Sequence, residues 1–289
     1  MEQQKKELTI TRIVNAPREV VFKAWTDASQ LAQWWGPAGF TNPVCEIDAR
    51  PGGAILIHMQ GPDGTIYPMT GTFVEVVEPE RIVFKSSAMD KDYHPLFEVL
   101  NTISFSQEGD KTRINLQFTV SKITPEAAPY LAGMDEGWKL SLDRFDTFAA
   151  EPIIIERTFN APITRLWEAI SDRDVMKQWY FDLAEFKTEP GFEFSFEGGK
   201  DNNIYVHLCK VTEVIPGRKL TYSWRYKGYT GNSFVTFELN DEGEKTRLTL
   251  THVGLGTFPA NNPDFAKHNF VEGWTYIIGK SLREFIEKA

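Results

Sequence analysis

The amino-acid sequence contains the same passage twice, and this repeat constrains the fold more than any other feature. The segments Arg12–Trp35 and Arg157–Tyr180 align at a constant offset of 145 residues, and 8 of the 24 aligned positions are identical. Average composition would give roughly one match in 15 positions. Two later anchors recur in the same order: Gly109–Arg113 beside Gly243–Arg247, and Glu136-Gly137-Trp138 beside Glu272-Gly273-Trp274. Solenoid units repeat every 20 to 50 residues, so this longer repeat indicates a duplicated domain.

The length of the chain fits this interpretation. A chain of 289 residues accommodates two domains of about 150 residues each. We place the first domain at residues 1–150 and the second, which is more divergent, at residues 151–289. Because 42% of the residues are hydrophobic, each half can bury a substantial core.

Charge and hydropathy narrow the classes of partner. The net charge is −9, and the sequence contains no cluster of Lys and Arg residues. Both observations argue against nucleic-acid binding and against a polybasic membrane anchor. The start, Met1–Leu8, is polar and charged, unlike a signal peptide, and no apolar run reaches about 18 residues. We therefore expect a cytoplasmic protein with no nucleic-acid partner and no membrane segment.

Residues that could carry catalysis or bind a metal are scattered. Cys45 and Cys209 do not occupy matching positions in the two copies, so we interpret them as reduced, buried thiols. The five histidines form no H-x-x-x-H or H-E-x-x-H pattern, and the chain has no Gly-x-Ser-x-Gly nucleophile motif. We therefore expect no catalytic residue, no metal site and no cofactor.

Both copies follow one plan of secondary structure. A short strand, Leu8–Val14 or Ile153–Phe159, leads into Asn-Ala-Pro, where Asn15 or Asn160 is predicted to cap a helix that the proline begins. A second short helix follows, and in the first copy it ends at Gly36-Pro37. A series of antiparallel strands and a last amphipathic helix complete each copy. This order predicts an α+β unit in which a curved sheet packs against the last helix.

The motifs of the first copy resemble one family. They are the Asn-Ala-Pro start, Gln33–Pro37, Asp48–Gly53, Gly61–Gly64 and Glu78–Val83. Together they are similar to the family named for homology to the activator of the heat-shock protein 90 ATPase, within the SRPBCC superfamily. The second copy resembles it at its start, at Pro216–Arg218 and at Glu272–Trp274, but lacks the double glycine and the Gly-Pro-Asp-Gly turn.

The resemblance implies two helix-grip (START-like) domains. Each would be a curved antiparallel sheet wrapped around a long C-terminal helix, with two short helices near its N-terminus and often an apolar cavity between sheet and helix. It does not imply a particular activity, because one fold serves many functions.

The candidate ligand-binding residues lie where such a cavity would form. In the first copy they are Ile57, His58, Met59, Met69 and Trp138, and in the second copy Tyr205, His207, Trp224 and Trp274. Core packing is the alternative for each aromatic or methionine, and a hydrogen-bonded core or surface role is the alternative for each histidine. The bulkier aromatics of the second copy predict that it has the smaller cavity.

Three functional hypotheses remain open at this point. The first is a non-catalytic binding protein that holds an apolar small molecule or lipid-like ligand between sheet and last helix. The second is a chaperone-linked or other protein-interaction module, and the third is a small-molecule cyclase or hydrolase that would use His58, Tyr67, Tyr205 or His207 in the same cavity. Because a duplicated domain can supply a two-fold contact internally, we expect a monomer with an internal pseudo-two-fold.

Overall fold

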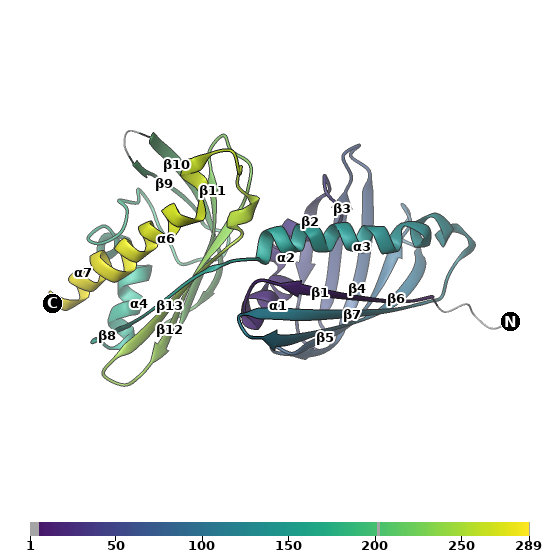
Figure 1. Cartoon of the computed structure of the whole chain (residues 1–289), viewed down its shortest axis with the longest axis horizontal. Coiled ribbons are helices and arrows are strands. Elements are labelled where there is room, and N and C mark those ends of the chain that lie inside the picture. The colour runs from purple at the N-terminus through teal and green to yellow at the C-terminus, as the bar shows by residue number, and fades with distance from the viewer. Residues whose placement is uncertain (1–5, 201–202, 289) are drawn as a thin grey trace. The chain divides into compact units, whose positions relative to one another are not determined.

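The computed structural model describes residues 6–200 and 203–288, so the first five residues of the polar start lie outside it. The chain divides into two compact units, Met1–Glu151 and Pro152–Ala289, which we call unit 1 and unit 2. Each unit has its own antiparallel sheet, short helices after the first strand and a helical segment at its end (Figure 1). The predicted α+β class and the tandem helix-grip architecture are confirmed.

Unit 1 is built on a sheet that has seven strands within the described residues, in the order β1-β7-β6-β5-β4-β3-β2. The strands are β1 (Lys6–Val14), β2 (Thr41–Ile47), β3 (Ala54–Gln60), β4 (Ile66–Val77), β5 (Arg81–Met89), β6 (Pro95–Glu108) and β7 (Lys111–Ser121). The helices are α1 (Arg18–Thr26), α2 (Ala28–Trp34), the 3-10 turn η1 (Pro125–Ala127) and α3 (Ala128–Ala149). Helix α3 lies across the sheet, with α1 and α2 near its C-terminal half (Figure 1).

Unit 2 repeats this design with one strand fewer in its described part. The sheet order is β8-β13-β12-β11-β10-β9. The strands are β8 (Ile153–Phe159), β9 (Glu193–Lys200), β10 (Asn203–Ile215), β11 (Lys219–Tyr226), β12 (Ser233–Asp241) and β13 (Thr246–Val253). The helical segments are α4 (Ile163–Ser171), α5 (Arg173–Met176), η2 (Leu255–Thr257), η3 (Pro263–Phe265), α6 (Lys267–Tyr276), the π-helical η4 (Ile277–Leu282) and α7 (Arg283–Glu287).

The repeated motifs of the sequence contact one another in both units. The Thr112 hydroxyl of the Lys-Thr-Arg motif donates a 2.7 Å hydrogen bond to the Ala16 carbonyl of Asn-Ala-Pro. Thr246 donates to the Ala161 carbonyl at 2.8 Å in the same way. Both threonines are fully buried, so their hydroxyls satisfy carbonyls that would otherwise lack a partner. These anchors therefore recur because they tie the first helix to the sheet.

The repeated tryptophans also have a structural role. The indole N–H of Trp34 donates to the Ala24 carbonyl at 3.0 Å, and that of Trp179 donates to the Ala169 carbonyl at 2.8 Å. The first bond joins α2 to α1, and the second joins the turn after α5 to α4. The indole bonds therefore tie the segment that carries each tryptophan to the preceding helix.

The predicted helix caps were wrong. The N-cap residues of α1 and α4 are Pro17 and Pro162, and neither helix has a side-chain cap. Asn15 lies two residues before the N-cap, and its amide instead donates to the Glu151 carboxylate at 3.4 Å. An asparagine at that distance cannot reach the free N–H groups of the first turn.

Strand β2 was not predicted. Its sequence includes Pro43, which cannot donate to a ladder, and β2 lies at the sheet edge where such a residue is tolerated. The corresponding part of unit 2, residues 181–190, forms no strand, and its Leu183 and Phe186 are buried instead. In the part of the chain that the structure describes, no helix has the length and apolarity to cross a bilayer.

Candidate ligand-binding cavities

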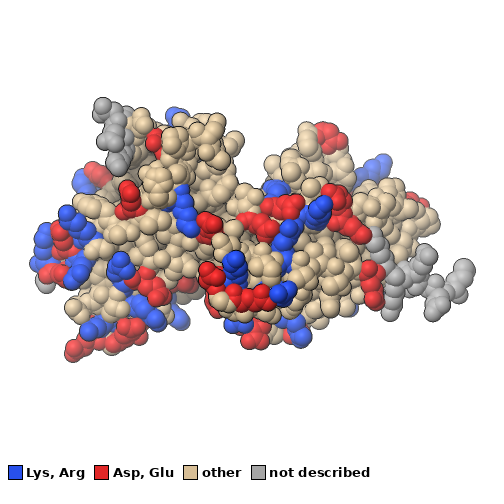
Figure 2. All heavy atoms as spheres, in the orientation of Figure 1, with Lys and Arg blue, Asp and Glu red and all other residues tan. Residues whose placement is uncertain are grey.

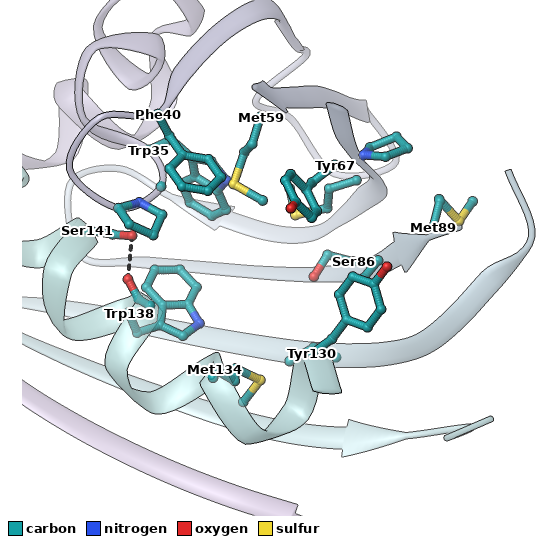
Figure 3. A pocket seen from close by; sticks show the side chains of 18 of the residues that line it. Trp35, Phe40, Met59, Tyr67, Ser86, Met89, Tyr130, Met134, Trp138 and Ser141 are labelled. Atoms are coloured by element: carbon teal, nitrogen blue, oxygen red, sulfur yellow. Dashed lines mark hydrogen bonds between the residues drawn. The ribbon is translucent and has the colours of Figure 1, made fainter. Parts of the chain in front are cut away.

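Helix α3 packs closely against the sheet over only half of its length. Its buried residues all lie in the second half, from Ser141 to Ala149. The first half stands away from the sheet, and the space beneath it is a cavity of about 420 Å³ (Figure 3). Small-molecule sites generally enclose roughly 300–1,000 Å³, so the cavity is large enough for a ligand.

The cavity of unit 1 has walls from the helix, the sheet and the loop after α2. The helix contributes residues of one face, spaced by three and four: Pro129, Tyr130, Gly133, Met134, Gly137, Trp138 and Ser141. The sheet and the loop contribute Trp35, Gly36, Pro37, Phe40, Met59, Tyr67, Pro68, Met69, Ser86, Ala88, Met89, Phe97, Val99 and Asn101. None of these described lining residues is charged, and four of the six methionines of the chain are among them.

One polar pair lies at the sheet side of this cavity. The buried Asn101 amide donates to the Ser86 hydroxyl at 2.9 Å and to the carbonyls of Phe84 and Val99 at 3.2 Å. Its NH₂ group is therefore occupied by the protein, and its carbonyl oxygen remains as an acceptor. On the helix, the Ser141 hydroxyl donates back to the Gly137 carbonyl at 2.7 Å (Figure 3).

Two glycines of α3 enlarge the cavity. A Cβ atom added at Gly133 or Gly137 would meet no atom within 4 Å, and both residues lie on the helix face that lines the cavity. Glycine is unfavourable inside a helix by about 1 kcal/mol relative to alanine. The two glycines therefore lower the stability of the helix and leave space open in the cavity.

The loop wall of the cavity is held by Arg144 from α3. Its guanidinium donates to the carbonyls of Gln33 at 2.7 Å, Gly36 at 2.9 Å and Pro37 at 3.0 Å. These carbonyls lie at and just beyond the C-terminal end of α2, where backbone acceptors have no helical partner. Arg144 therefore fixes the position of the loop that carries Trp35 and Phe40.

The structure brings three of the predicted residues of unit 1 into this cavity and leaves two outside it. Met59, Met69 and Trp138 line the cavity. Ile57 is 1% exposed and faces the core beneath it. His58 does not line the cavity, because adjacent residues of a strand point to opposite faces; its ring contacts the Tyr93 hydroxyl at 3.0 Å.

Unit 2 has a cavity of about 360 Å³ between α6 and its sheet. All four predicted residues of this unit, Tyr205, His207, Trp224 and Trp274, are among its lining residues. Asp264 also lines it and accepts a 2.6 Å hydrogen bond from the Tyr205 hydroxyl. This cavity therefore contains a histidine and carboxylates, which the described lining of the unit 1 cavity lacks.

Strand register relates the two cavities residue by residue. Ile57 pairs with Met69 in unit 1, and Phe196 pairs with His207 in unit 2, so His207 takes the place of Met69. By the same reasoning through the next strand pair, Trp224 takes the place of Ser86. Large aromatic side chains therefore occupy space in unit 2 that is open in unit 1.

The two buried histidines of unit 2 are held in the neutral form. Burial lowers the pKa of His207 to about 4 and that of His252 to about 3. The Trp274 indole donates to Nδ1 of His252 at 2.9 Å, and Nε2 of His252 lies 2.8 Å from the Ser233 hydroxyl. Ser233 donates in turn to the Trp224 carbonyl at 3.2 Å. Since Nδ1 accepts, the proton of the ring is on Nε2, and the chain of bonds joins α6 to three strands.

Several residues that shape these cavities were missed from the sequence. Asn101 and Ser86 meet only through strand register, and Arg144 reaches carbonyls more than 100 residues away in sequence. The Glu-Gly-Trp repeat was the available signal, because its glycine faces the cavity in each unit.

Other reactive groups lie outside the cavities. Cys45 and Cys209 are free thiols, and burial raises the pKa of both, that of Cys45 to about 12. Among the residues that the structure describes, no group of three or more His, Cys, Asp or Glu side chains is arranged to hold a metal ion.

Comparison with known proteins gives the same division into two copies. A model of the family described as "Activator of Hsp90 ATPase homolog 1-like protein" matches residues 15–150 and again residues 160–287. The Hsp90 co-chaperone AHA1 of Saccharomyces cerevisiae is 27% identical over 128 residues, which are 42% of this chain and 34% of that protein. The chain therefore spans about a third of the length of this relative.

Solved structures each match about half of the chain. Protein Ms6760 from Mycobacterium smegmatis is 30% identical, with a TM-score of 0.43, and the match covers 48% of this chain and 88% of that one. A protein from Arthrobacter aurescens is 25% identical, with a TM-score of 0.44, and the match covers 49% of this chain and 84% of that one. With the family matched over both units, the chain belongs to the family of Activator of Hsp90 ATPase homolog 1-like proteins and carries two of its domains in tandem.

Proposed function

We propose that the chain is a non-catalytic binding protein whose unit 1 holds one uncharged, apolar small molecule between α3 and the sheet. The observation that carries this proposal is the cavity of about 420 Å³ whose described lining has no charged residue. Burying a charged ligand there would cost several kcal/mol without a partner for its charge, whereas an apolar ligand loses only contact with water.

The lining suits a ligand of this kind. Four methionines provide flexible, polarisable side chains that adapt to different apolar shapes. Trp138 is packed between Phe118, at a ring distance of 4.5 Å, and Trp35, at 5.2 Å, so it offers a rigid aromatic wall. The Asn101 carbonyl oxygen lets the ligand carry one hydrogen-bond donor, such as a hydroxyl.

The first half of α3 provides a way in. No residue from Ala128 to Leu140 is buried, while the second half of the helix is anchored by Leu142, Phe145 and Phe148. Segments with few buried contacts open at low cost in free energy. Ligand entry would therefore require only the part of the helix before Trp138 to move.

The test fills the cavity from the helix side. Gly137→Leu adds a side chain into the open space, and we expect it to weaken the binding of a neutral naphthalene dye, N-phenyl-1-naphthylamine, at least tenfold. The variant should melt no lower than the wild-type chain, because leucine is a better helix former than glycine.

Gly273→Leu is the matched control. Gly273 is the counterpart of Gly137 in unit 2, it lines that cavity, and a Cβ there also meets no atom within 4 Å. Dye binding should be unchanged in this variant. If Gly137→Leu bound the dye as tightly as the wild type, ligand binding in the cavity of unit 1 would be refuted.

A second proposal is a chaperone-linked role, and the similarity to yeast AHA1 supports it. In this case the chain would act through its surface on an Hsp90 partner. The test is the rate of ATP hydrolysis by Hsp90 from the organism that encodes this chain, measured with and without the full chain. An unchanged rate together with no co-purification of the two proteins would remove this proposal.

A further inference from the structure

The repeated arginine of the two units is neutralised in unit 1. Arg12 on β1 extends to α3, where its guanidinium lies 2.7 Å from the Asp143 carboxylate and 3.5 Å from the Asp146 carboxylate. These two ion pairs connect the edge strand β1 to the helix. The Arg12 and Asp146 side chains are 27% and 33% exposed and that of Asp143 is 52% exposed, so solvent partly screens both pairs.

In unit 2 the arginine is kept and both carboxylates are gone. Arg157 matches Arg12 in the repeat, and the Glu-Gly-Trp motif aligns Asp143 with Gly279. The π-helical η4 adds one residue, so the buried Leu282 takes the place of Phe145 and Arg283 takes the place of Asp146. A pair of carboxylates has therefore become a glycine and a second cation.

Arg157 has no substitute for the lost partners. No carboxylate in the described residues lies within the 4 Å of an ion pair, and its guanidinium donates only to the neighbouring Glu156 carbonyl at 2.7 Å. Gly279 is the helix residue it approaches, since a Cβ there would lie 3.8 Å from the Arg157 Nε. The position of the Asp143 side chain is thus open in unit 2.

This opening is part of a shallow surface groove of about 630 Å³, which is lined by Arg157 of β8 and by residues of α6, η4 and α7. Arg157, Lys280 and Arg283 line it, and β8 and α6 run side by side in Figure 1. Lys and Arg side chains gather around η4 and α7 at this end of unit 2 (Figure 2). Glu272 also lines the groove, and Arg283 is paired with Glu287. Among the described residues, Arg157 and Lys280 are the lining cations without a carboxylate partner, and the Lys280 ammonium lies 5.4 Å from the Tyr276 ring centre.

The groove also has features of a polypeptide site. Strand β8 is the edge of its sheet and is paired only with β13, so its outer backbone groups are open to another strand. Tyr276 is 59% exposed and Val271 is 38% exposed, which places apolar surface beside the cations.

From these observations we propose that the groove of unit 2 binds an acidic segment of a protein partner, whose carboxylates take the places that Asp143 and Asp146 occupy in unit 1. Helix residues three apart have side chains roughly 5–6 Å apart, and alternate residues of an extended strand lie roughly 6.5–7 Å apart on one face. An Asp-x-Asp or Glu-x-Glu segment beside β8 therefore matches the spacing of the two missing carboxylates. The proposal does not depend on the ligand of unit 1.

The experiment measures fluorescence anisotropy of a labelled nine-residue peptide that carries Asp-x-Asp, against the same peptide with Asn-x-Asn. The full chain should bind the Asp peptide at least tenfold more tightly at low ionic strength, where charge interactions are least screened. Arg157→Ala should weaken binding at least tenfold. Arg12→Ala is the matched control and should leave binding unchanged, because Arg12 already has its carboxylates.

A second variant separates loss of the site from loss of the fold. Gly279→Asp with Arg283→Asp restores the carboxylates of unit 1 inside unit 2, and Gly279 has room for the side chain. This double variant should lose peptide binding at least tenfold while its melting temperature stays at or above that of the wild type. Equal binding of the Asp and Asn peptides would overturn the proposal. Unchanged binding of the Asp peptide by Arg157→Ala or by the double variant would also overturn it. Displacement by 20 mM acetate at constant ionic strength would instead indicate a small-anion site and would also overturn it.

Discussion

At the scale of single residues, one difference between the copies shows how the same position can contact the last helix through a different interaction. The Lys-Thr-Arg anchors align Phe118 with His252, and both contact the tryptophan of the last helix. Phe118 stacks on Trp138 through its ring face, whereas His252 accepts a hydrogen bond from the indole of Trp274. The histidine provides a hydrogen-bond acceptor for the buried tryptophan N–H. The folded state of unit 2 therefore requires His252 to be neutral.

The neutral state of His252 makes the stability of unit 2 depend on pH. Its pKa is about 3 in the folded state because of burial and about 6.5 when unfolded, so between these values the unfolded state binds more protons. The free energy of unfolding is then highest above pH 6.5 and falls as the pH drops towards 3, by up to about 1.4 kcal/mol per pH unit for this group. His207, whose pKa burial lowers to about 4, adds to the same slope.

His252→Phe copies the solution of unit 1 and should remove one of these two contributions. We expect urea unfolding of unit 2 between pH 4.5 and pH 7 to show a shallower slope in this variant, by up to about 1.4 kcal/mol per pH unit. Identical slopes for the variant and the wild type would show that His252 does not control the acid sensitivity.

At the scale of elements, the last helix of unit 1 has two tasks that divide along its length. The second half anchors it in the core through Leu142, Phe145 and Phe148, and the first half, with Gly133 and Gly137, covers the cavity. Arg144 lies between these two halves, and its hydrogen bonds hold the loop after α2 in a fixed position relative to the helix.

Arg144→Met tests this junction. It removes the donors to the carbonyls of Gln33 and of residues 35–37 while keeping the length of the side chain. Charge-assisted hydrogen bonds contribute about 1.5–3 kcal/mol each in favourable cases. We expect unit 1 to lose about 2–3 kcal/mol of unfolding free energy and the naphthalene dye to bind more weakly. A loss below 0.5 kcal/mol in chemical denaturation, with unchanged dye binding, would contradict the positioning role of Arg144.

The elements were more predictable from the sequence than the cavities. The repeat and the periodic apolar residues identified the first strands, the short helices and the last helices, because these depend on local pattern. His58 was placed in the cavity although its neighbours Ile57 and Met59 are on the opposite face of β3, an error that strict alternation would have avoided. The Asn101–Ser86 pair and the Arg144 contacts depend on strand register and on chain segments far apart, which no local pattern records.

At the scale of the whole molecule, duplication kept one framework and changed its chemistry. The threonine and tryptophan anchors are the same in both units, so the framework is preserved. The cavity of unit 1 is uncharged in its described lining, while that of unit 2 contains His207 and Asp264, and the edge arginine is paired in one unit and open in the other. Each unit is therefore expected to bind a different class of partner.

The central claim is that only unit 1 holds an apolar ligand, and native mass spectrometry of the full chain with a saturating neutral naphthalene dye tests it most directly. The account predicts one bound dye per chain for the wild type, none for Gly137→Leu and one for Gly273→Leu. Two bound dyes per chain, or one that survives in Gly137→Leu and disappears in Gly273→Leu, would contradict it.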